Sequence, residues 1–120
     1  MTKIIPVFRV FDYTKTIEFY VNWLGCKIEW EHKPEGSPFY MRVSLRGAAF
    51  DLSEHHGECS PGARISLVDF GGLEAYHEEL KSKHYKFFNP AVEKVEWDPG
   101  TLEMGVIDPF FNRILFNEKP

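Results

Sequence analysis

Few polar residues of this chain have the types and spacing that chemistry requires. The stretch His55-His56-Gly57-Glu58-Cys59 is the densest group of potential metal ligands, but its spacing matches no zinc site and its polar neighbours predict a solvated loop. Asp51 and Glu103 are carboxylates on predicted strands, and nothing in the sequence pairs them for acid–base catalysis. Neither a nucleophile triad nor a glycine-rich phosphate loop is present. The sequence therefore predicts no catalytic residue and no cofactor.

The composition limits the classes of function. The 120 residues fit one domain, residues 1–120, and the 16% of aromatic residues exceed what a core of this size needs, so some rings should line a pocket or an interface. A net charge of −4 without a Lys/Arg run argues against nucleic acid. No apolar run is long enough to span a membrane, and the first residues do not resemble a signal peptide. Cys26 and Cys59 are expected to be free thiols, which favours a cytoplasmic location.

The elements that must position these residues form a near-repeat. The first copy, residues 4–53, reads as strand, helix and three strands, and the second copy, residues 63–117, reads the same way. In the first helix Ile17, Tyr20, Val21 and Leu24 form one apolar stripe. The expected strands are 4–10, 26–32, 39–45, 48–53, 64–68, 90–97, 101–107 and 113–117, with a hairpin turn at residues 46–47 and a second helix over 73–83. This order predicts an α+β fold of two βαβββ modules, with a mixed sheet that curls around a cleft.

Three motifs carry a resemblance to a known family. They are Val7–Asp12 with Thr16–Tyr20 and Leu24–Cys26; Ile65–Asp69 with Leu73–Tyr76; and the turn Asp108–Ile114. Together they resemble the vicinal oxygen chelate superfamily of glyoxalases, dioxygenases and bleomycin-resistance proteins, and most closely its bleomycin-resistance-like branch. Phe111 replaces the glycine of the family's turn, and Asn112 is expected to take the left-handed conformation there.

The resemblance also identifies where metal-dependent relatives hold their ion. Those positions fall at Ile5, Asp51, Ala63 and Leu115, and only Asp51 has a donor atom. One carboxylate does not hold a catalytic divalent ion, which usually takes three protein ligands or more. We therefore expect no metal site.

Alternation along the strands predicts which residues face the cleft. If Ile5 faces the cleft, then Val7 and Arg9 of the same strand face it too. By the same alternation, the other strands contribute Ala49, Asp51 and Ser53; Ile65 and Leu67; and Arg113, Leu115 and Asn117. Arg9 matches an arginine that glyoxalase-like relatives use for a substrate carboxylate, although a surface salt bridge explains it equally well. The aromatic candidates would stack on a flat or cationic ligand, or would anchor a dimer. The predicted ligand-binding residues are Val7, Arg9, Trp30, Phe39, Tyr40, Asp51, Trp97, Glu103, Phe110, Phe111 and Arg113.

The resemblance implies three functions to weigh. The first is a metal-free small-molecule binder, similar to bleomycin-resistance proteins, that sequesters a drug or metabolite as a cytoplasmic homodimer. The second is a metal-dependent glyoxalase-type lyase or isomerase, or a dioxygenase, with a displaced metal site that uses Asp51, Glu103 and the loop histidines. The third is a non-catalytic subunit that binds a protein partner in the same cleft. The sequence does not identify the ligand, and bleomycin serves only as an analogy.

Overall fold

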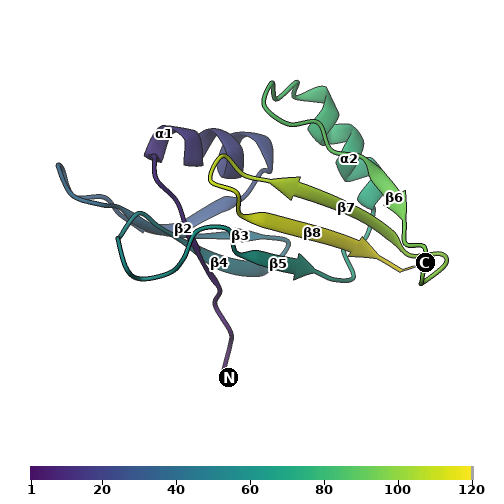
Figure 1. Ribbon diagram of the computed structural model, residues 1–120, viewed down its shortest axis with the longest axis horizontal. Coiled ribbons are helices and arrows are strands. Elements are labelled where there is room, and N and C mark those ends of the chain that lie inside the picture. The colour runs from purple at the N-terminus through teal and green to yellow at the C-terminus, as the bar shows by residue number, and fades with distance from the viewer. Residues whose placement is uncertain (120) are drawn as a thin grey trace. The chain divides into compact units, whose positions relative to one another are not determined.

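Two four-stranded mixed sheets, each with its own helical segment, make up the structure, a computed structural model that describes residues 1–119 (Figure 1). The chain divides into two units: the first comprises Met1–Ala63 and Asp108–Asn112, and the second comprises Arg64–Ile107 and the residues from Arg113 on. The elements are β1 Val7–Arg9, α1 Tyr13–Thr16, η1 Ile17–Trp23, β2 Lys27–His32, β3 Tyr40–Leu45, β4 Ala48–Ser53, β5 Arg64–Leu67, α2 Leu73–Ser82, β6 Val92–Lys94, β7 Leu102–Ile107 and β8 Arg113–Glu118. The predicted α+β fold of two βαβββ modules is confirmed.

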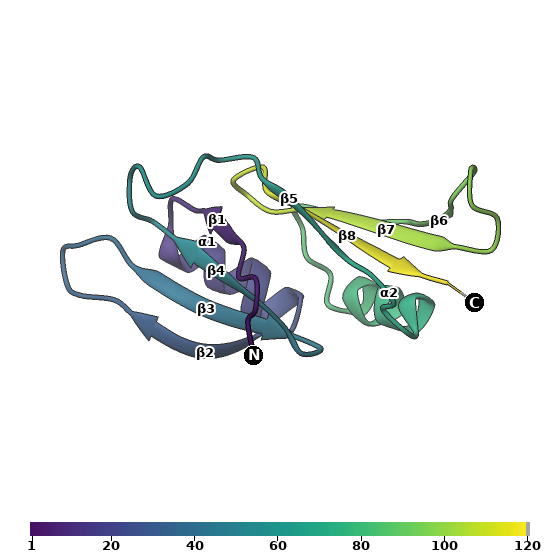
Figure 2. The ribbon, with the colours of Figure 1, turned by 90° about the horizontal axis from the view of Figure 1, so that it is seen from below.

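The sheet of the first unit has the strand order β1-β4-β3-β2, which Figure 2 shows from below. β1 runs parallel to β4, and the other neighbours are antiparallel. The β3–β4 hairpin closes through Arg46 and Gly47, whose φ angles of 52° and 82° are those of the two-residue turn that matches the twist of paired strands. This short turn fixes the register, so that Leu45 lies opposite Ala48 and every later pair follows.

The helical segment of the first unit begins at α1 and continues without a break into η1. Asp12 caps its start, since the carboxylate accepts the backbone N–H of Lys15 at 2.8 Å. η1 is a π-helix, as its closing hydrogen bond from the N–H of Leu24 to the carbonyl of Phe19 illustrates. Its buried rings face the sheet, and the Tyr20 ring lies 5.8 Å from the ring of Phe50. The predicted helix is present, but its wider winding also buries Phe19 and Trp23.

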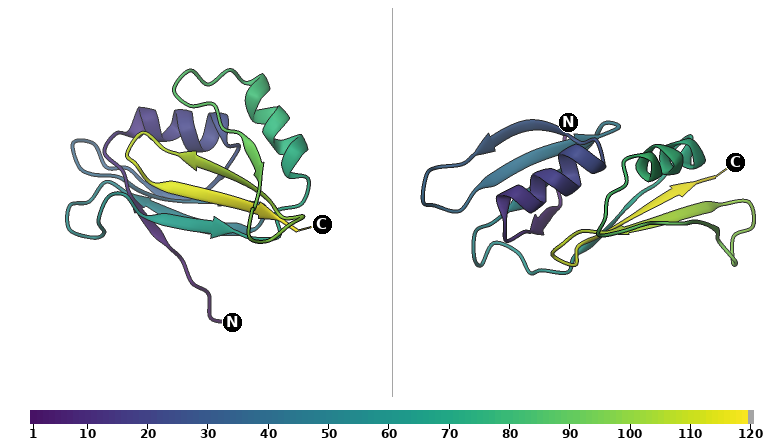
Figure 3. Two further views of the ribbon diagram at one scale, coloured as in Figure 1. Left: turned by 45° about the vertical axis from the view of Figure 1, so that its right-hand side comes forward. Right: turned by 90° about the horizontal axis from the view of Figure 1, so that it is seen from above.

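The second unit repeats this arrangement with the strand order β5-β8-β7-β6. α2 packs on one face of that sheet (Figure 3, right), where Tyr76 lies 5.6 Å from Phe116 between ring centroids. The Glu118 carboxylate accepts the backbone N–H groups of Gly72 and Leu73, so the end of β8 caps the start of α2. No helix within residues 1–119 is long and apolar enough to cross a bilayer.

Two expectations for the second unit were wrong. Ile65 and Leu67 were expected on the cleft face, but they pair with Ile114 and Phe116, which lie on the face that α2 covers. The predicted strand over residues 90–97 is shorter: β6 ends at Lys94, and Trp97 lies in a turn with 83% of its surface exposed. The reason for the first error is the strand period of two, because a one-residue slip in the alignment moves each side chain to the other face.

The turn of residues 108–112 joins β7 to β8 but packs within the first unit. Asp108 is buried and accepts the Tyr20 hydroxyl at 2.6 Å as well as the side-chain amide of Asn112 at 2.9 Å. The same Asn112 amide donates to the carbonyl of Arg9, and its oxygen accepts the N–H of Ala63. These bonds join residues that lie up to 103 positions apart in the sequence. Among residues 1–119, every buried polar side-chain atom has a hydrogen-bond partner.

The buried Tyr20 hydroxyl leads to a prediction about alkaline pH. Burial, and next the charge of Asp108, raise the pKa of Tyr20 well above 10. Above pH 10 the unfolded chain therefore releases a proton that the folded chain keeps, and stability falls as pH rises. In urea unfolding between pH 8 and pH 11, the wild type should lose roughly 1 kcal/mol more per pH unit above pH 10 than Tyr20→Phe. Parallel pH profiles of the two proteins would contradict this assignment.

The conformation of Phe111 corrects a third expectation. Phe111, and not Asn112, takes the left-handed conformation, with φ at 71°, because the buried Asn112 side chain is needed for the hydrogen bonds just described. The Phe111 ring is 77% exposed and so recovers little by burial. Because a left-handed residue with a Cβ costs more than glycine does, Phe111→Gly should raise the free energy of unfolding by about 0.5–1 kcal/mol. Denaturant unfolding measures this gain, and a loss of stability would show that the ring has a folded-state partner.

Candidate ligand-binding site

The first unit carries a sheet face opposite to its helix. Phe50 and Leu52 of β4 lie on the face that packs against the helix. Because side chains alternate along a strand, Asp51 and Ser53 lie on the opposite face. The register adds Val7 and Arg9 of β1, which pair with Asp51 and Ser53. On β3 the same face carries Tyr40, Arg42 and Ser44, which pair with Ser53, Asp51 and Ala49. We call this the open face of the first unit.

Asp51 is the centre of a hydrogen-bond network on the open face. Its Oδ1 accepts Arg42 Nε at 2.7 Å, and its Oδ2 accepts Arg42 Nη2 at 3.1 Å and the Tyr40 hydroxyl at 2.5 Å. Only 2% of Asp51 is exposed, whereas the side chain of its partner Arg42 is 33% exposed, so the carboxylate is buried and the guanidinium is partly open to solvent. Both oxygens are thus occupied by protein donors in the bidentate geometry that arginine forms with carboxylates. Burial, and next the bond to Asp51, raise the pKa of Tyr40, so this hydroxyl stays protonated to a higher pH than that of an ordinary tyrosine.

Two aromatic rings cover the network. A bulge in β2 between Ile28 and Trp30 brings Trp30 opposite Arg42. The indole stacks on the Tyr40 ring at 5.6 Å between centroids and 11° between planes, and the Arg42 guanidinium lies 5.2 Å from its centre. Nevertheless 44% of Trp30 remains exposed. The arrangement is an aromatic surface that can stack with a flat ligand.

The polar loop after β4 is held to this sheet. The Ser53 hydroxyl donates to Glu58 and accepts the backbone N–H of His55, whose ring lies 6.4 Å from Tyr40. Burial raises the pKa of the Cys59 thiol, so Cys59 is protonated at neutral pH and a poor nucleophile. Throughout residues 1–119, no three His, Cys, Asp or Glu side chains come together in a group that could hold a metal ion.

The structure brings together only some of the predicted ligand-binding residues. Trp30, Tyr40 and Asp51 form one cluster on the open face, and Val7 lies beside Asp51. Arg9 shares this face, but its guanidinium donates to the carbonyls of Val10 and Glu54 and lies over the Phe11 ring. In the second unit, Glu103 and Arg113 lie on one face of the sheet, whereas Trp97 lies in a turn.

The three remaining candidates are the phenylalanines of the first unit. Phe39 and Phe110 are buried, against Tyr13 and Phe11 respectively. Phe111 is exposed in the 108–112 turn. Only Phe111 among these three therefore presents most of its ring to an incoming molecule.

Arg42, the residue that neutralises Asp51, is not among the ligand-binding residues predicted from the sequence. The signal was present, because a two-residue turn at 46–47 places residues 45 and 48 opposite each other and, three steps further out, Arg42 opposite Asp51. A cross-strand pair of opposite charges is a common stabilising pair in antiparallel sheets.

The residues at the metal positions of the superfamily do not fit a metal. The position assigned to Ala63 was wrong by one residue: Arg64 pairs with Arg113 and shares the face of Leu115, which is opposite to that of Ile65. Arg64 is a cation, and Ile5 and Leu115 have no donor atom. The remaining donor, Asp51, already has both oxygens bonded to Arg42 and Tyr40.

Two βαβββ modules, each with a four-stranded mixed sheet, define a glyoxalase-like fold. The family model described as "Glyoxalase superfamily protein" matches residues 1–120, and the chain belongs to this superfamily. No curated protein sequence matches this chain significantly.

Solved structures with the same fold have low sequence identity to this chain. A glyoxalase/bleomycin resistance protein from Catenulispora acidiphila superposes with a TM-score of 0.75 at 18% identity, covering 100% of both chains. A bleomycin resistance determinant encoded on transposon Tn5 gives 0.72 at 16%, with 99% of this chain and 98% of that chain covered. A bleomycin-binding protein complexed with bleomycin gives 0.66 at 19%, with 100% of both covered. The likeness establishes the fold.

Proposed function

We propose that this protein is a metal-free small-molecule-binding protein that sequesters a drug or metabolite, as bleomycin-resistance proteins do. The observation that carries the proposal is that both carboxylate oxygens of Asp51 already accept hydrogen bonds, from Arg42 and Tyr40. An enzyme that used Asp51 as a metal ligand would first have to break the ion pair of its buried carboxylate with Arg42. A structural neighbour that binds bleomycin supports a small organic ligand for this fold.

In this proposal the ligand contacts the open face of the first unit. The exposed part of Trp30, fixed by Tyr40 and Arg42, offers a flat surface to a planar heteroaromatic group. Val7 and Arg9 of β1 and the exposed Phe111 remain candidate contacts, as do Glu103, Arg113 and Trp97 of the second unit. Phe39 and Phe110 would contribute indirectly, because they pack against the rings of Tyr13 and Phe11.

We further propose that the protein is a cytoplasmic homodimer. Exposed Phe11 and Phe111 in the first unit supply apolar surface that a second copy could cover. Cys26 and Cys59 are both free thiols, which suits a reducing compartment.

Native mass spectrometry of freshly purified, tag-free protein tests the proposal. We expect a dimer with no metal increment, with or without an organic ligand, and no change in mass when Ni²⁺ or Co²⁺ is added at a few equivalents. One divalent ion per subunit would overturn the metal-free assignment.

Ligand binding is tested separately with bleomycin as the probe. Trp30→Ala should weaken any measured affinity by about tenfold or more, since it removes the stacking surface. Phe87→Ala, which removes an exposed ring from the second unit, is the matched control and should leave the affinity unchanged. Equal losses in both variants would argue against the open face as the site.

A further inference from the structure

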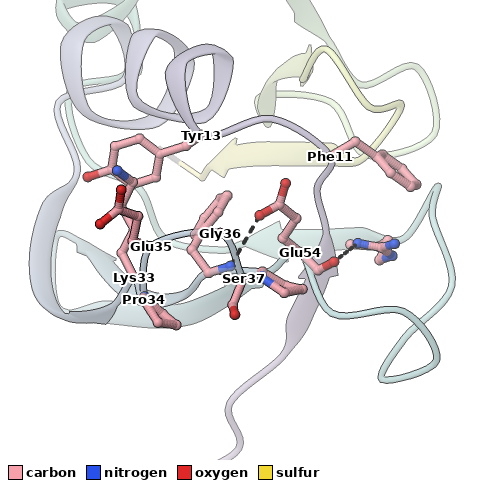
Figure 4. Close-up of a pocket in the computed structure, with 11 residues that line it drawn as sticks. Phe11, Tyr13, Lys33, Pro34, Glu35, Gly36, Ser37 and Glu54 are labelled. Carbon is pink, nitrogen blue, oxygen red and sulfur yellow. Dashed lines mark hydrogen bonds between the residues drawn. The ribbon is translucent and has the colours of Figure 1, made fainter.

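A cavity of about 590 Å³ lies in the first unit, among the residues that follow β1, the loop of residues 33–38 between β2 and β3, and Glu54 after β4 (Figure 4). This volume suits a small organic molecule. The superfamily's metal positions are not among the residues that line it. The cavity is therefore a second candidate ligand site, apart from the aromatic surface around Trp30.

Three aromatic rings form the apolar part of the cavity. Tyr13 packs edge-on against Phe39, at 5.0 Å between centroids and 89° between planes, and because Phe39 is buried, Tyr13 supplies the more exposed ring of this pair. Phe11 is half exposed and contributes a second, separate ring surface. Figure 4 draws Phe11 and Tyr13 at opposite sides of the cavity, with Glu54 between them. An apolar body can thus contact rings at either side.

The charged groups of the cavity are balanced and held in place. Two cations, Arg9 and Lys33, line it together with two carboxylates, Glu35 and Glu54. The Lys33 ammonium lies 4.4 Å from the centre of the Tyr13 ring, and the Arg9 guanidinium lies 4.3 Å from that of Phe11. Each cation is held on a ring face and not by a carboxylate of the cavity, so both signs of charge remain available to a ligand.

Hydrogen bonds to β1 and to Phe39 anchor Glu54, one of the two carboxylates of the cavity. Its Oε1 accepts the backbone N–H of Phe39 at 3.1 Å, its own N–H donates to the carbonyl of Phe39, and its carbonyl accepts Arg9 Nη1. The described bonds to its carboxylate use one oxygen. The other oxygen can therefore accept a hydrogen bond from an ammonium group without any rearrangement of the loop.

We infer that this cavity binds a zwitterion with an aromatic body, of which an aromatic amino acid is the simplest example. The ammonium of the ligand would bind Glu54, its carboxylate would bind Lys33, and its ring would contact Tyr13, which packs on the buried Phe39. A ligand with one charge leaves either the cations or the carboxylates of the cavity uncompensated, and each missing charge-assisted bond weakens binding. Arg9 and Phe39 border both this cavity and the proposed open-face site, but the inference does not depend on Asp51 or Trp30, so the two sites can be tested separately.

Three related probes separate the contributions of the two charges. Phenylalanine carries both charges, phenethylamine carries only the ammonium, and 3-phenylpropionate carries only the carboxylate. In ¹H–¹⁵N NMR titrations, phenylalanine should shift the amide signals of Gly36, Ser37 and Phe39, and the two single-charge probes should bind about tenfold or more weakly. Absence of shifts at millimolar phenylalanine, or equal binding of either single-charge probe, would overturn the inference.

Two charge-removing variants assign each charge to its residue. Glu54→Gln keeps the acceptor for the Phe39 N–H and removes only the charge, so it should weaken phenylalanine and phenethylamine but not 3-phenylpropionate. Lys33→Met keeps an unbranched apolar chain over Tyr13 and should weaken phenylalanine and 3-phenylpropionate but not phenethylamine. Glu79→Gln, an exposed carboxylate of α2, is the control and should match the wild type. Unchanged phenylalanine affinity in Glu54→Gln would refute the assignment.

Discussion

Asp108→Asn is expected to lower the free energy of unfolding by about 3 kcal/mol at neutral pH. The amide oxygen can still accept the backbone N–H groups of Phe110 and Asn112, as Asp108 Oδ1 does at 2.8 Å. The amide nitrogen, however, replaces an acceptor at 2.9 Å from Asn112 Nδ2, so two donors face each other in a buried site. A buried polar group left without its partner costs about 1–3 kcal/mol, and the Tyr20 bond weakens as well. Urea unfolding measures the loss.

The same substitution should change how stability depends on pH. Burial raises the pKa of Asp108, and the hydrogen bonds from Tyr20, Asn112 and Phe110 only partly oppose this effect. A carboxyl with a raised folded-state pKa contributes stability that is fully present below its unfolded value of about 3.8 and is lost as pH rises through the folded value. The deficit of Asp108→Asn relative to the wild type should therefore increase as pH falls toward 4.

The control is Asp69→Asn, an exposed aspartate in the left-handed region, where asparagine is well tolerated. It should change stability by less than about 0.5 kcal/mol at every pH. If Asp108→Asn behaves like this control, then the hydrogen bonds of the 108–112 turn contribute little to folding.

Local rules account for most of what the sequence predicts about the fold. The turn at Arg46 and Gly47 sets the register of a hairpin, and the apolar stripe of Ile17, Tyr20 and Leu24 sets the buried side of a helix. Both effects act between residues close in the chain, so a single sequence is enough to predict them. The register was in fact sufficient to pair Arg42 with Asp51, although the sequence analysis did not use it.

The features that escaped prediction depend on contacts distant in the sequence or on small changes of backbone winding. The bond between Tyr20 and Asp108 joins residues 88 positions apart, and nothing near either residue indicates its partner. This distant contact also decides the turn geometry, because Asn112 is held by Arg9 and Phe111 must take the left-handed conformation instead. The bulge before Trp30 likewise has no glycine or proline to mark it, yet it determines that Trp30 lies opposite Arg42.

Asp51→Asn should test the open face of the first unit through two independent measurements. The substitution keeps the shape of the side chain but offers Arg42 Nη2 and the Tyr40 hydroxyl a nitrogen in place of an acceptor. Hydrogen bonds to charged groups contribute about 1.5–3 kcal/mol, and we expect a loss of that size in urea unfolding. We also expect the pKa of Tyr40 to fall toward its ordinary value of 10, because Asp51 is one cause of its rise.

The second measurement separates a direct effect on Tyr40 from general destabilisation. Tyrosinate absorbance near 295 nm, followed to pH 11 in the folded protein, should rise at lower pH in Asp51→Asn than in the wild type. Glu29→Gln, which alters the hydrogen bond of an exposed carboxylate with Ser44 on the same sheet, should leave the tyrosine titration unchanged. An unchanged titration in Asp51→Asn would mean that Asp51 and Tyr40 are not coupled in solution. The carboxylate would then be open to other partners, a metal ion among them, and the metal-free proposal would lose its main support.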